Sequence, residues 1–197
     1  LHKQGYVMVE KRLNRVLDFA MEFEMDRLFH LNFLGYSVFQ TSRRGEYEGN
    51  RVASRARLEG MISRYTGMGL LHEIREQLEK VLTSVFHGKY VGCLGVDMMI
   101  YEDESGGFGV QPCVEINLRY NMGIVSIALQ RFLQEEVEGV FTIRFSPKPG
   151  EIMQSVEENR DAYPLQVKTG RITAGYINLT PVSRESRFVA ELYVGDK

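Results

Sequence analysis

The clearest pattern in the sequence is a strict alternation of apolar and polar residues near its middle. Residues 114–119 are VEINLR, which places Glu115, Asn117 and Arg119 at every other position. Side chains at positions i, i+2 and i+4 of a strand share one face. The alternation therefore predicts a strand with a carboxylate, an amide and a guanidinium on one face. The apolar residues between them are expected on the other face, which fixes the register.

An apolar run from residue 91 precedes this strand and contains a single acid, Asp97, and the turn Glu102–Gly109 separates the two. We predict a hairpin in which Asp97 lies opposite Glu115, at a cross-strand spacing of about 5 Å. Two carboxylates so close repel each other unless a cation neutralises them, and Mg²⁺ binds such oxygen ligands. A solvated hairpin face with an incidental acidic pair is the alternative.

The predicted register makes three further pairs. Gly95 would lie opposite Asn117 and leave open space for a ligand. Cys93 would lie opposite Arg119, and Cys113 would face Met99 rather than Cys93.

A second alternating segment, residues 18–26, predicts another half-buried strand. Phe19, Met21, Phe23 and Met25 share one face, and the acids Asp18, Glu22 and Glu24 share the other. Residues 28–40 form the next β-rich run, joined by a turn at Asp26-Arg27. The acidic face could line a cationic site, but for Glu22 and Glu24 we expect contact with water.

Apolar residues at three- and four-residue steps predict two main helices. The first spans residues 69–88 and ends at Gly88, a residue that commonly terminates helices. The second begins at Asn121, a residue that can cap a helix, and runs to about residue 137. The start of this helix follows Arg119 directly, and the two together suit an anion such as phosphate.

The remaining segments give weaker signals. Residues 5–10 predict a short strand. The arginine-rich residues 41–69 indicate either a lid over an anionic ligand or a surface excursion with a short helix near residues 53–65. Residues 151–161 suggest a helical turn or a mobile segment. Further strands are predicted at residues 140–145, 171–179 and 187–194, the last two as a C-terminal hairpin.

These elements predict an α+β fold, a largely antiparallel sheet with two main helices packed on it and a C-terminal hairpin. Residues 1–145 would form one domain, and residues 146–197 an extension packed on it. A length of 197 residues is enough for one such domain with an extension. The net charge of −2 gives no case for binding nucleic acid or an anionic membrane. No apolar run reaches the roughly 18 residues of a membrane span. Two cysteines, expected as free thiols, indicate a reducing, cytoplasmic setting.

Taken together, Asp97 and the Glu115-x-Asn117-x-Arg119 motif resemble the ATP-grasp superfamily, to which D-alanine–D-alanine ligase and biotin carboxylase belong. The resemblance covers roughly residues 5–140. It implies that Asp97, Glu115 and Asn117 hold Mg²⁺, or Mn²⁺, against the phosphates of ATP. It also implies that Arg119 contacts phosphate or the reacting intermediate.

The start of the chain supports this resemblance independently. Residues 9–13, VEKRL, look like the hinge that seats adenine in this family. Glu10 and the backbone of Lys11 and Leu13 would then hydrogen-bond the base, and Asp18 would take the ribose hydroxyls. In the family, a glycine loop and two lysines that bind ATP precede the hinge. The chain begins at the hinge, so we expect an excised part that lacks half of the ATP clamp.

The resemblance implies an ATP- and Mg²⁺-dependent ligase that joins a small carboxylic acid to an amine or other nucleophile through an acyl phosphate. The parent protein would be the enzyme, while this part alone would be inactive without the missing N-terminal region. Two alternatives remain: a non-catalytic nucleotide-binding or interaction module with a degenerate ATP-grasp fold, and a structural β-rich interaction domain. Substrate identity and homo-oligomer formation stay open.

Overall fold

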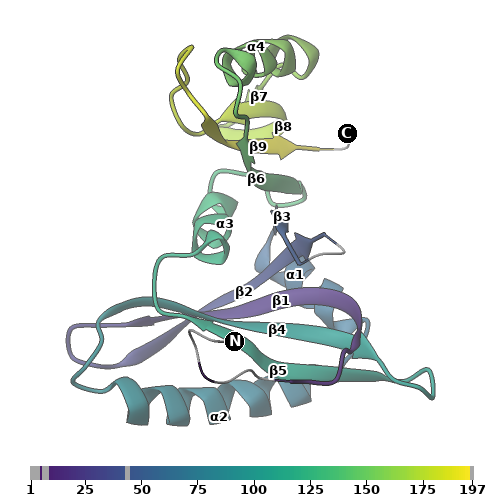
Figure 1. The fold of residues 1–197 in the computed structure, drawn as a ribbon, viewed down its shortest axis with the longest axis vertical. Helices are drawn as coiled ribbons and strands as arrows, with labels where there is room; N and C mark the ends of the chain where they lie inside the picture. Colours follow the sequence, from purple (N-terminus) through teal and green to yellow (C-terminus); the bar gives the residue numbers. More distant parts are fainter. Residues whose placement is uncertain (1–4, 6–8, 43–44, 196–197) are drawn as a thin grey trace.

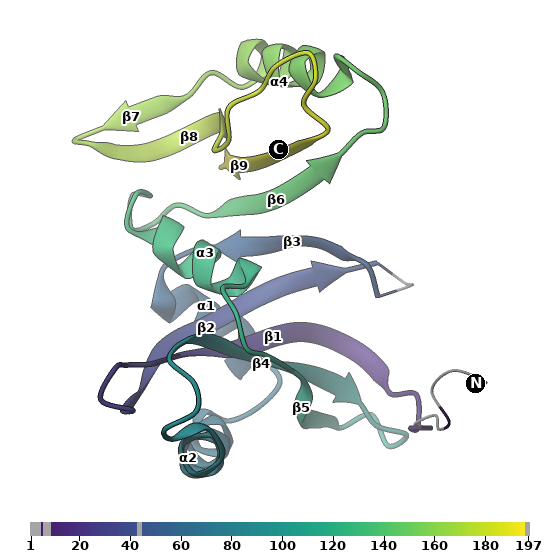
Figure 2. The same ribbon diagram turned by 60° about the vertical axis from the view of Figure 1, so that its left-hand side comes forward.

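The fold is a single twisted sheet of nine antiparallel strands with four helices, seen in a computed structural model that describes residues 5, 9–42 and 45–195. The strand order is β5-β4-β1-β2-β3-β6-β9-β8-β7. Figures 1 and 2 show the two halves of this sheet, which meet where β3 pairs with β6. The strands are β1 (Asn14–Met25), β2 (Leu31–Thr41), β3 (Tyr47–Val52), β4 (Gly92–Glu102), β5 (Phe108–Asn117), β6 (Gly139–Phe145), β7 (Gln166–Lys168), β8 (Arg171–Asn178) and β9 (Phe188–Val194). The helices are α1 (Arg55–Ser63), α2 (Met68–Phe86), α3 (Met122–Gln130) and α4 (Glu151–Ala162).

This architecture confirms the predicted α+β class with its antiparallel sheet and C-terminal hairpin. The two expected main helices are present as α2 and α3, and α1 and α4 are added to them. Residues 151–161 thus form a full helix. The arginine-rich segment contains the short helix α1, together with the unexpected strand β3; Arg43 and Arg44 lie outside the described residues.

The main core lies under one face of β1, β2 and β4. Phe19, Met21 and Phe23 alternate onto this face, as period 2 predicts, and all three are buried. Helices α1 and α2 cover them with Leu58, Ile62, Leu71 and Leu82. The burial of this face directs the even-numbered side chains of β1 to the opposite face of the sheet.

Helix α3 packs against the opposite face, over β2 and β3. It begins as predicted, since the Asn121 side chain accepts a hydrogen bond of 2.9 Å from the Ile124 backbone N–H. Its predicted end at residue 137 is wrong, because the helix stops at Gln130. The backbone of Phe132 and Gln134 bonds instead to Ile172 of β8, which brings Leu133 into a second core.

The hairpin β4–β5 has the predicted register at its functional end. Asp97 pairs with Glu115 and Gly95 with Asn117. The predicted facing of Cys113 and Met99 is wrong, because Met99 pairs with Gln111 and the register shifts between these pairs. Pro112, which has no N–H for the ladder, lies in the bulged segment. Cys93 and Cys113 are both free thiols.

Strand β5 is the edge of the sheet, and its apolar face is not covered. Val114, Ile116 and Leu118 are exposed, so the register that the alternation predicted is not fixed by burial of this face. The register is instead held by pairing with β4.

The chain before β1 differs from its prediction. Residues 6–8 of the expected strand lie outside the described residues, and residues 9–13 have no regular structure.

None of the helices in the described part of the chain is both long and apolar enough to cross a bilayer.

Candidate functional site

A cavity of about 320 Å³ opens on the α3 face of the sheet, where β1, β2, β3, β4 and β5 meet the start of α3. Four predicted site residues line it together: Asp97, Glu115, Asn117 and Arg119. The cavity wall also includes residues that were not predicted as site residues. These are Glu22, Ser37, Phe39, Thr41, Gly45, Tyr47, Asn50, Asn121, Met122 and Gly123.

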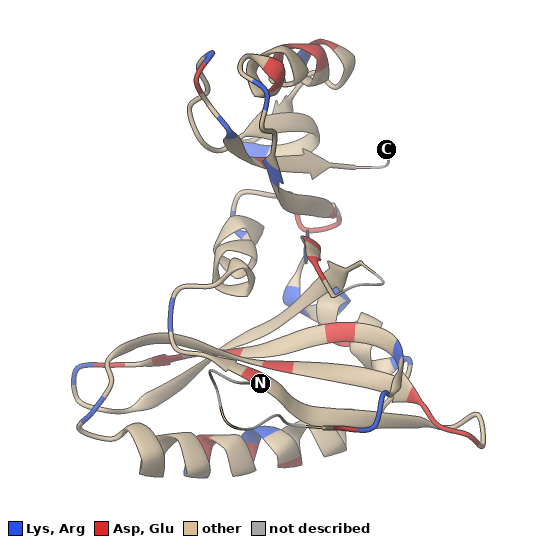
Figure 3. Cartoon of the chain, in the orientation of Figure 1, with Lys and Arg blue, Asp and Glu red and all other residues tan. Residues whose placement is uncertain are grey.

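The acidic residues Asp97 and Glu115 lie opposite each other on β4 and β5 in the wall of this cavity. Burial and the neighbouring charge of Glu115 raise the pKa of Asp97 from 3.8 to about 6. The Asn117 amide donates a hydrogen bond of 3.0 Å to Asp97 Oδ2, which offsets only part of this effect. Figure 3 shows in red the acidic positions along β1 and β4. A cation placed between Asp97 and Glu115 would relieve their repulsion.

The donor set fits a hard divalent cation that keeps other oxygen ligands. It consists of two carboxylates and one amide, and Mg²⁺ typically takes one or two carboxylates plus water or phosphate oxygens. Within the part of the chain that the structure describes, no group of three or more His, Cys, Asp and Glu side chains is placed so that it could hold a metal ion. A Mg²⁺ ion held by Asp97, Glu115 and Asn117 would therefore need its remaining oxygen ligands from water or from a bound ligand.

Arg119 lies beside this donor set and orients it. Its Nη2 donates a hydrogen bond of 2.9 Å to Asn117 Oδ1, while Asn117 uses its nitrogen for Asp97. The Arg119 side chain remains exposed at the cavity and can meet an anion. The N-terminus of α3 follows within three residues and adds the positive end of a helix dipole.

Glu22 is the main site residue that the sequence did not reveal. It was expected in water, but it is 1 % exposed and accepts hydrogen bonds of 2.9 Å from Ser37 Oγ and Asn121 Nδ2. The two neighbouring positions 95 and 123 accept only glycine, because a Cβ at Gly95 or Gly123 would overlap the Glu22 carboxylate. The predicted open space at Gly95 is therefore wrong: Glu22 and Asn121 fill it.

Glu22 should make the stability of the protein depend on pH. Burial raises its pKa from 4.5 to about 7, since the hydrogen bonds from Asn121 and Ser37 offset only part of the desolvation. The folded chain therefore holds this proton more tightly than the unfolded chain. The resulting stability is full below pH 4.5 and is lost as pH rises through about 7. The difference between the two pKa values corresponds to about 3 kcal/mol.

Urea denaturation at pH 4.5 and pH 8 tests this expectation. The wild type should lose about 3 kcal/mol more unfolding free energy over this range than the variant Glu22→Gln. Glu24→Gln changes an exposed acid on the same strand face and should behave as the wild type. Equal losses in the wild type and Glu22→Gln would show that Glu22 is not held protonated.

The predicted adenine and ribose residues lie outside this cavity. Glu10 and Lys11 are exposed, and Lys11 forms an ion pair of 2.9 Å with Glu104 at the β4–β5 turn. Leu13 is half-buried just before β1. Their role in binding adenine stays a prediction.

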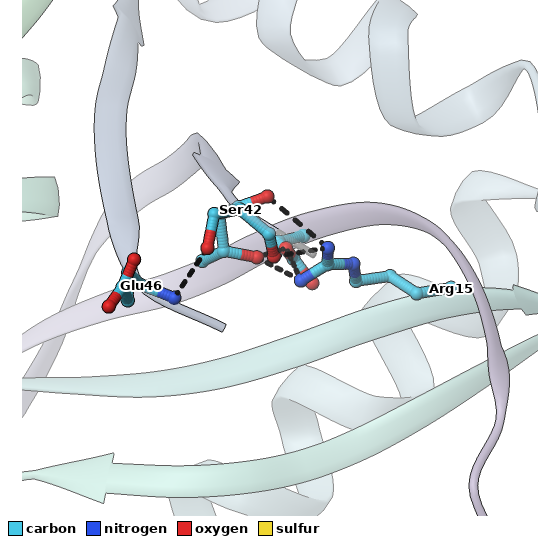
Figure 4. A network of polar contacts seen from close by, with 5 residues as sticks. Arg15, Ser42 and Glu46 are labelled. Atoms are coloured by element: carbon cyan, nitrogen blue, oxygen red, sulfur yellow. Dashed lines mark hydrogen bonds and ion pairs between the residues drawn. The ribbon is translucent and has the colours of Figure 1, made fainter. Parts of the chain in front are cut away.

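Asp18 of β1 belongs to a hydrogen-bond network with Arg15 and with Thr41 at the end of β2. Thr41 donates a hydrogen bond of 2.6 Å to Asp18 Oδ2, and Arg15 lies 3.1 Å from the same oxygen. Arg15 also donates to the backbone carbonyl of Ser42, and the Ser42 hydroxyl accepts from the Glu46 N–H (Figure 4). Asp18 is therefore already paired, and a ribose hydroxyl would have to share or replace these partners.

No protein-family model matches this chain, and no curated protein matches it. Among solved structures, it is similar to pyruvate carboxylase of Rhizobium etli, at 13% identity and a TM-score of 0.51 over 94% of this chain and 18% of that one. It is also similar to N5-carboxyaminoimidazole synthetase of Staphylococcus aureus complexed with ADP, at 13% identity and a TM-score of 0.47. That match covers 95% of this chain and 48% of the synthetase. The match to biotin carboxylase of Campylobacter jejuni has 10% identity and a TM-score of 0.44, and covers 94% and 43% of the two chains.

The match to pyruvate carboxylase supports the fold resemblance: the chain has an ATP-grasp-like fold. The chain spans about half the length of the synthetase that it matches.

Proposed function

We propose that this chain forms the Mg²⁺- and phosphate-binding part of an ATP-dependent ligase that activates a carboxylic acid. The observation that carries the proposal is the meeting of Asp97, Glu115, Asn117 and Arg119 around one cavity at the start of α3. Acidic and amide ligands for a cation lie there beside a guanidinium and a helix N-terminus for an anion. Mg²⁺ and a nucleotide phosphate together satisfy both halves of this arrangement.

In this proposal, a carboxylate oxygen of the substrate attacks the γ-phosphorus of ATP, and ADP leaves. An amine or other nucleophile then attacks the acyl carbon, and phosphate leaves. Mg²⁺, when bound, would neutralise the phosphate charge. Asp97, Glu115 and Asn117 would hold it, and Arg119 would stabilise the charge that develops during transfer. No protein nucleophile is needed for either step.

Glu22 has a supporting role in the same proposal. Glu22 joins β1 to the helix cap, because it accepts from Asn121, whose Oδ1 accepts from the Ile124 N–H. The start of α3 is thereby fixed relative to the strands that carry the acids. Such rigid placement is what charge stabilisation requires.

Trapping with hydroxylamine tests the proposed reaction. The full-length protein, MgATP and a panel of small carboxylic acids are expected to give a hydroxamate together with ADP, since hydroxylamine attacks an acyl phosphate at its acyl carbon. Asp97→Asn is the matched variant and should give neither product. Nucleotide binding without ADP release across the panel would favour the non-catalytic module. ADP release without hydroxamate would contradict acyl phosphate formation.

A further inference from the structure

Asn50 of β3 carries an unpaired polar group in the wall of the candidate site. The side chain is 1 % exposed, and its Nδ2 has no hydrogen-bond partner. Its strand partners are Phe39 and Phe141, so that it lies between apolar neighbours. An unpaired amide in such a place costs free energy, and native proteins rarely keep one without a reason.

The cavity supplies that reason. Across the described residues, three buried side-chain atoms have no hydrogen-bond partner: Tyr36 Oη, Arg75 Nε and Asn50 Nδ2. Arg75 Nε nevertheless forms an ion pair of 3.4 Å with Glu79. Of the three residues, only Asn50 lines the cavity that holds Asp97 and Arg119. Tyr36 belongs to the core under α1 and α2, on the other face of the sheet.

The orientation of the amide is set by Tyr47. The Tyr47 hydroxyl donates a hydrogen bond of 2.6 Å to Asn50 Oδ1, and burial raises the pKa of Tyr47, so the hydroxyl keeps its proton. Oδ1 is thus occupied and Nδ2 is the free donor. A free N–H donor requires an acceptor, and it would repel the donor of an ammonium group.

We propose that Asn50 binds an oxyanion of the reacting ligands, with Nδ2 donating a hydrogen bond to one of its oxygens. This inference rests on the proposed function, and it extends the site from β5 and α3 across the sheet to β3. Two groups have this chemistry: the terminal phosphate of the nucleotide and the carboxylate of the substrate. A protonated amine, which offers only N–H donors, would be repelled from this position. Tyr47 is a positioning residue that acts through Asn50.

Two variants of the full-length protein separate ligand binding from a structural role. Asn50→Leu keeps the size and removes the donor, and Asn50→Asp replaces the donor by an acceptor. Asn50→Leu loses the hydrogen bond from the Tyr47 hydroxyl, but it also removes the unpaired buried amide, and the exposed Tyr47 can bond to water instead. The two effects oppose each other, so this variant should melt close to the wild type. Asn32→Leu changes an exposed asparagine of β2 and serves as the control.

Calorimetric titrations with MgADP and with the Mg²⁺ complex of the ATP analogue AMP-PNP form the first arm. The KM for the acid that gives the most hydroxamate forms the second. Both Asn50 variants should bind MgADP as the wild type does. A loss of about tenfold or more in AMP-PNP affinity assigns the oxyanion to the terminal phosphate, and a similar rise in KM assigns it to the carboxylate.

Three results would overturn the inference. Unchanged values in both arms would show that Nδ2 meets no ligand. A lower melting temperature of Asn50→Leu with a parallel loss of MgADP affinity would assign Asn50 a structural role. Either of these two results, obtained with a wild type that binds MgADP, overturns this inference and leaves the proposed function standing. If the wild type binds no nucleotide, the proposed function fails and the inference with it.

Discussion

Replacing Glu115 by Gln and Asn117 by Ala in the full-length protein is expected to abolish turnover, by about 10³-fold or more. Both residues belong to the donor set around Asp97, and Asn117 hydrogen-bonds Asp97 directly. The double variant removes one charge and one oxygen ligand from the proposed cation site. Steady-state ADP release at saturating MgATP measures the effect.

The same variant should still fold, which separates a site from a structural face. Glu115 is exposed, and Asn117 makes two hydrogen bonds, one to Asp97 and one from Arg119, whose loss costs about 1–3 kcal/mol. The circular dichroism spectrum should therefore stay close to that of the wild type, with a moderately lower urea midpoint. Glu102→Gln is the matched control, because Glu102 is an exposed acid at the far end of β4, and this variant should keep full activity. A double variant that loses its fold would favour a structural role for the hairpin acids.

Arg119→Ala is expected to lower kcat by about 10²–10³-fold, as the loss of a donor to developing charge does in other enzymes. Arg119 is exposed at the cavity, so that its loss should cost little stability. Arg119→Lys should recover part of the rate, because lysine keeps the charge without the planar fork that donates to Asn117.

Binding of MgADP distinguishes the role of Arg119 in charge transfer from a role in holding the nucleotide. We expect the dissociation constant of MgADP to change by no more than about threefold in Arg119→Ala, a small effect beside the loss in rate. A large loss of MgADP affinity with an unchanged kcat would contradict the proposed role. Arg131→Ala, an exposed arginine just after α3, should change neither value.

The hairpin was the most predictable part of the site because its information is local. The alternation in residues 114–119, the acid in an apolar run and the turn between them fix the pairing of Asp97 with Glu115. The start of α3 was predictable for the same reason, because the side chain of Asn121 can cap a helix. Pro112 was the available signal for the bulge that displaces Cys113, since proline within a strand indicates an edge or a bulge.

The rest of the site depends on partners that are distant in sequence. Glu22 has the same local pattern as Glu24, and only the approach of α3 across the sheet buries one and leaves the other in water. Strand β3 has weak β propensity with Gly49 and polar neighbours, and it forms because β2 and β6 flank it. Asn50 could therefore not be placed in the site before the sheet was known. The end of α3 is set in the same way, by pairing with β8.

The central claim is that these residues bind a nucleotide through Mg²⁺. The melting temperature of the full-length protein with AMP-PNP, with and without Mg²⁺, tests it most directly. At 100 times the dissociation constant, the analogue should stabilise the protein by about 2.7 kcal/mol, which raises the melting temperature by several degrees. We predict this rise with Mg²⁺, its loss on adding EDTA, and its absence in Asp97→Asn. An equal melting temperature with and without Mg²⁺ in the wild type would contradict the account.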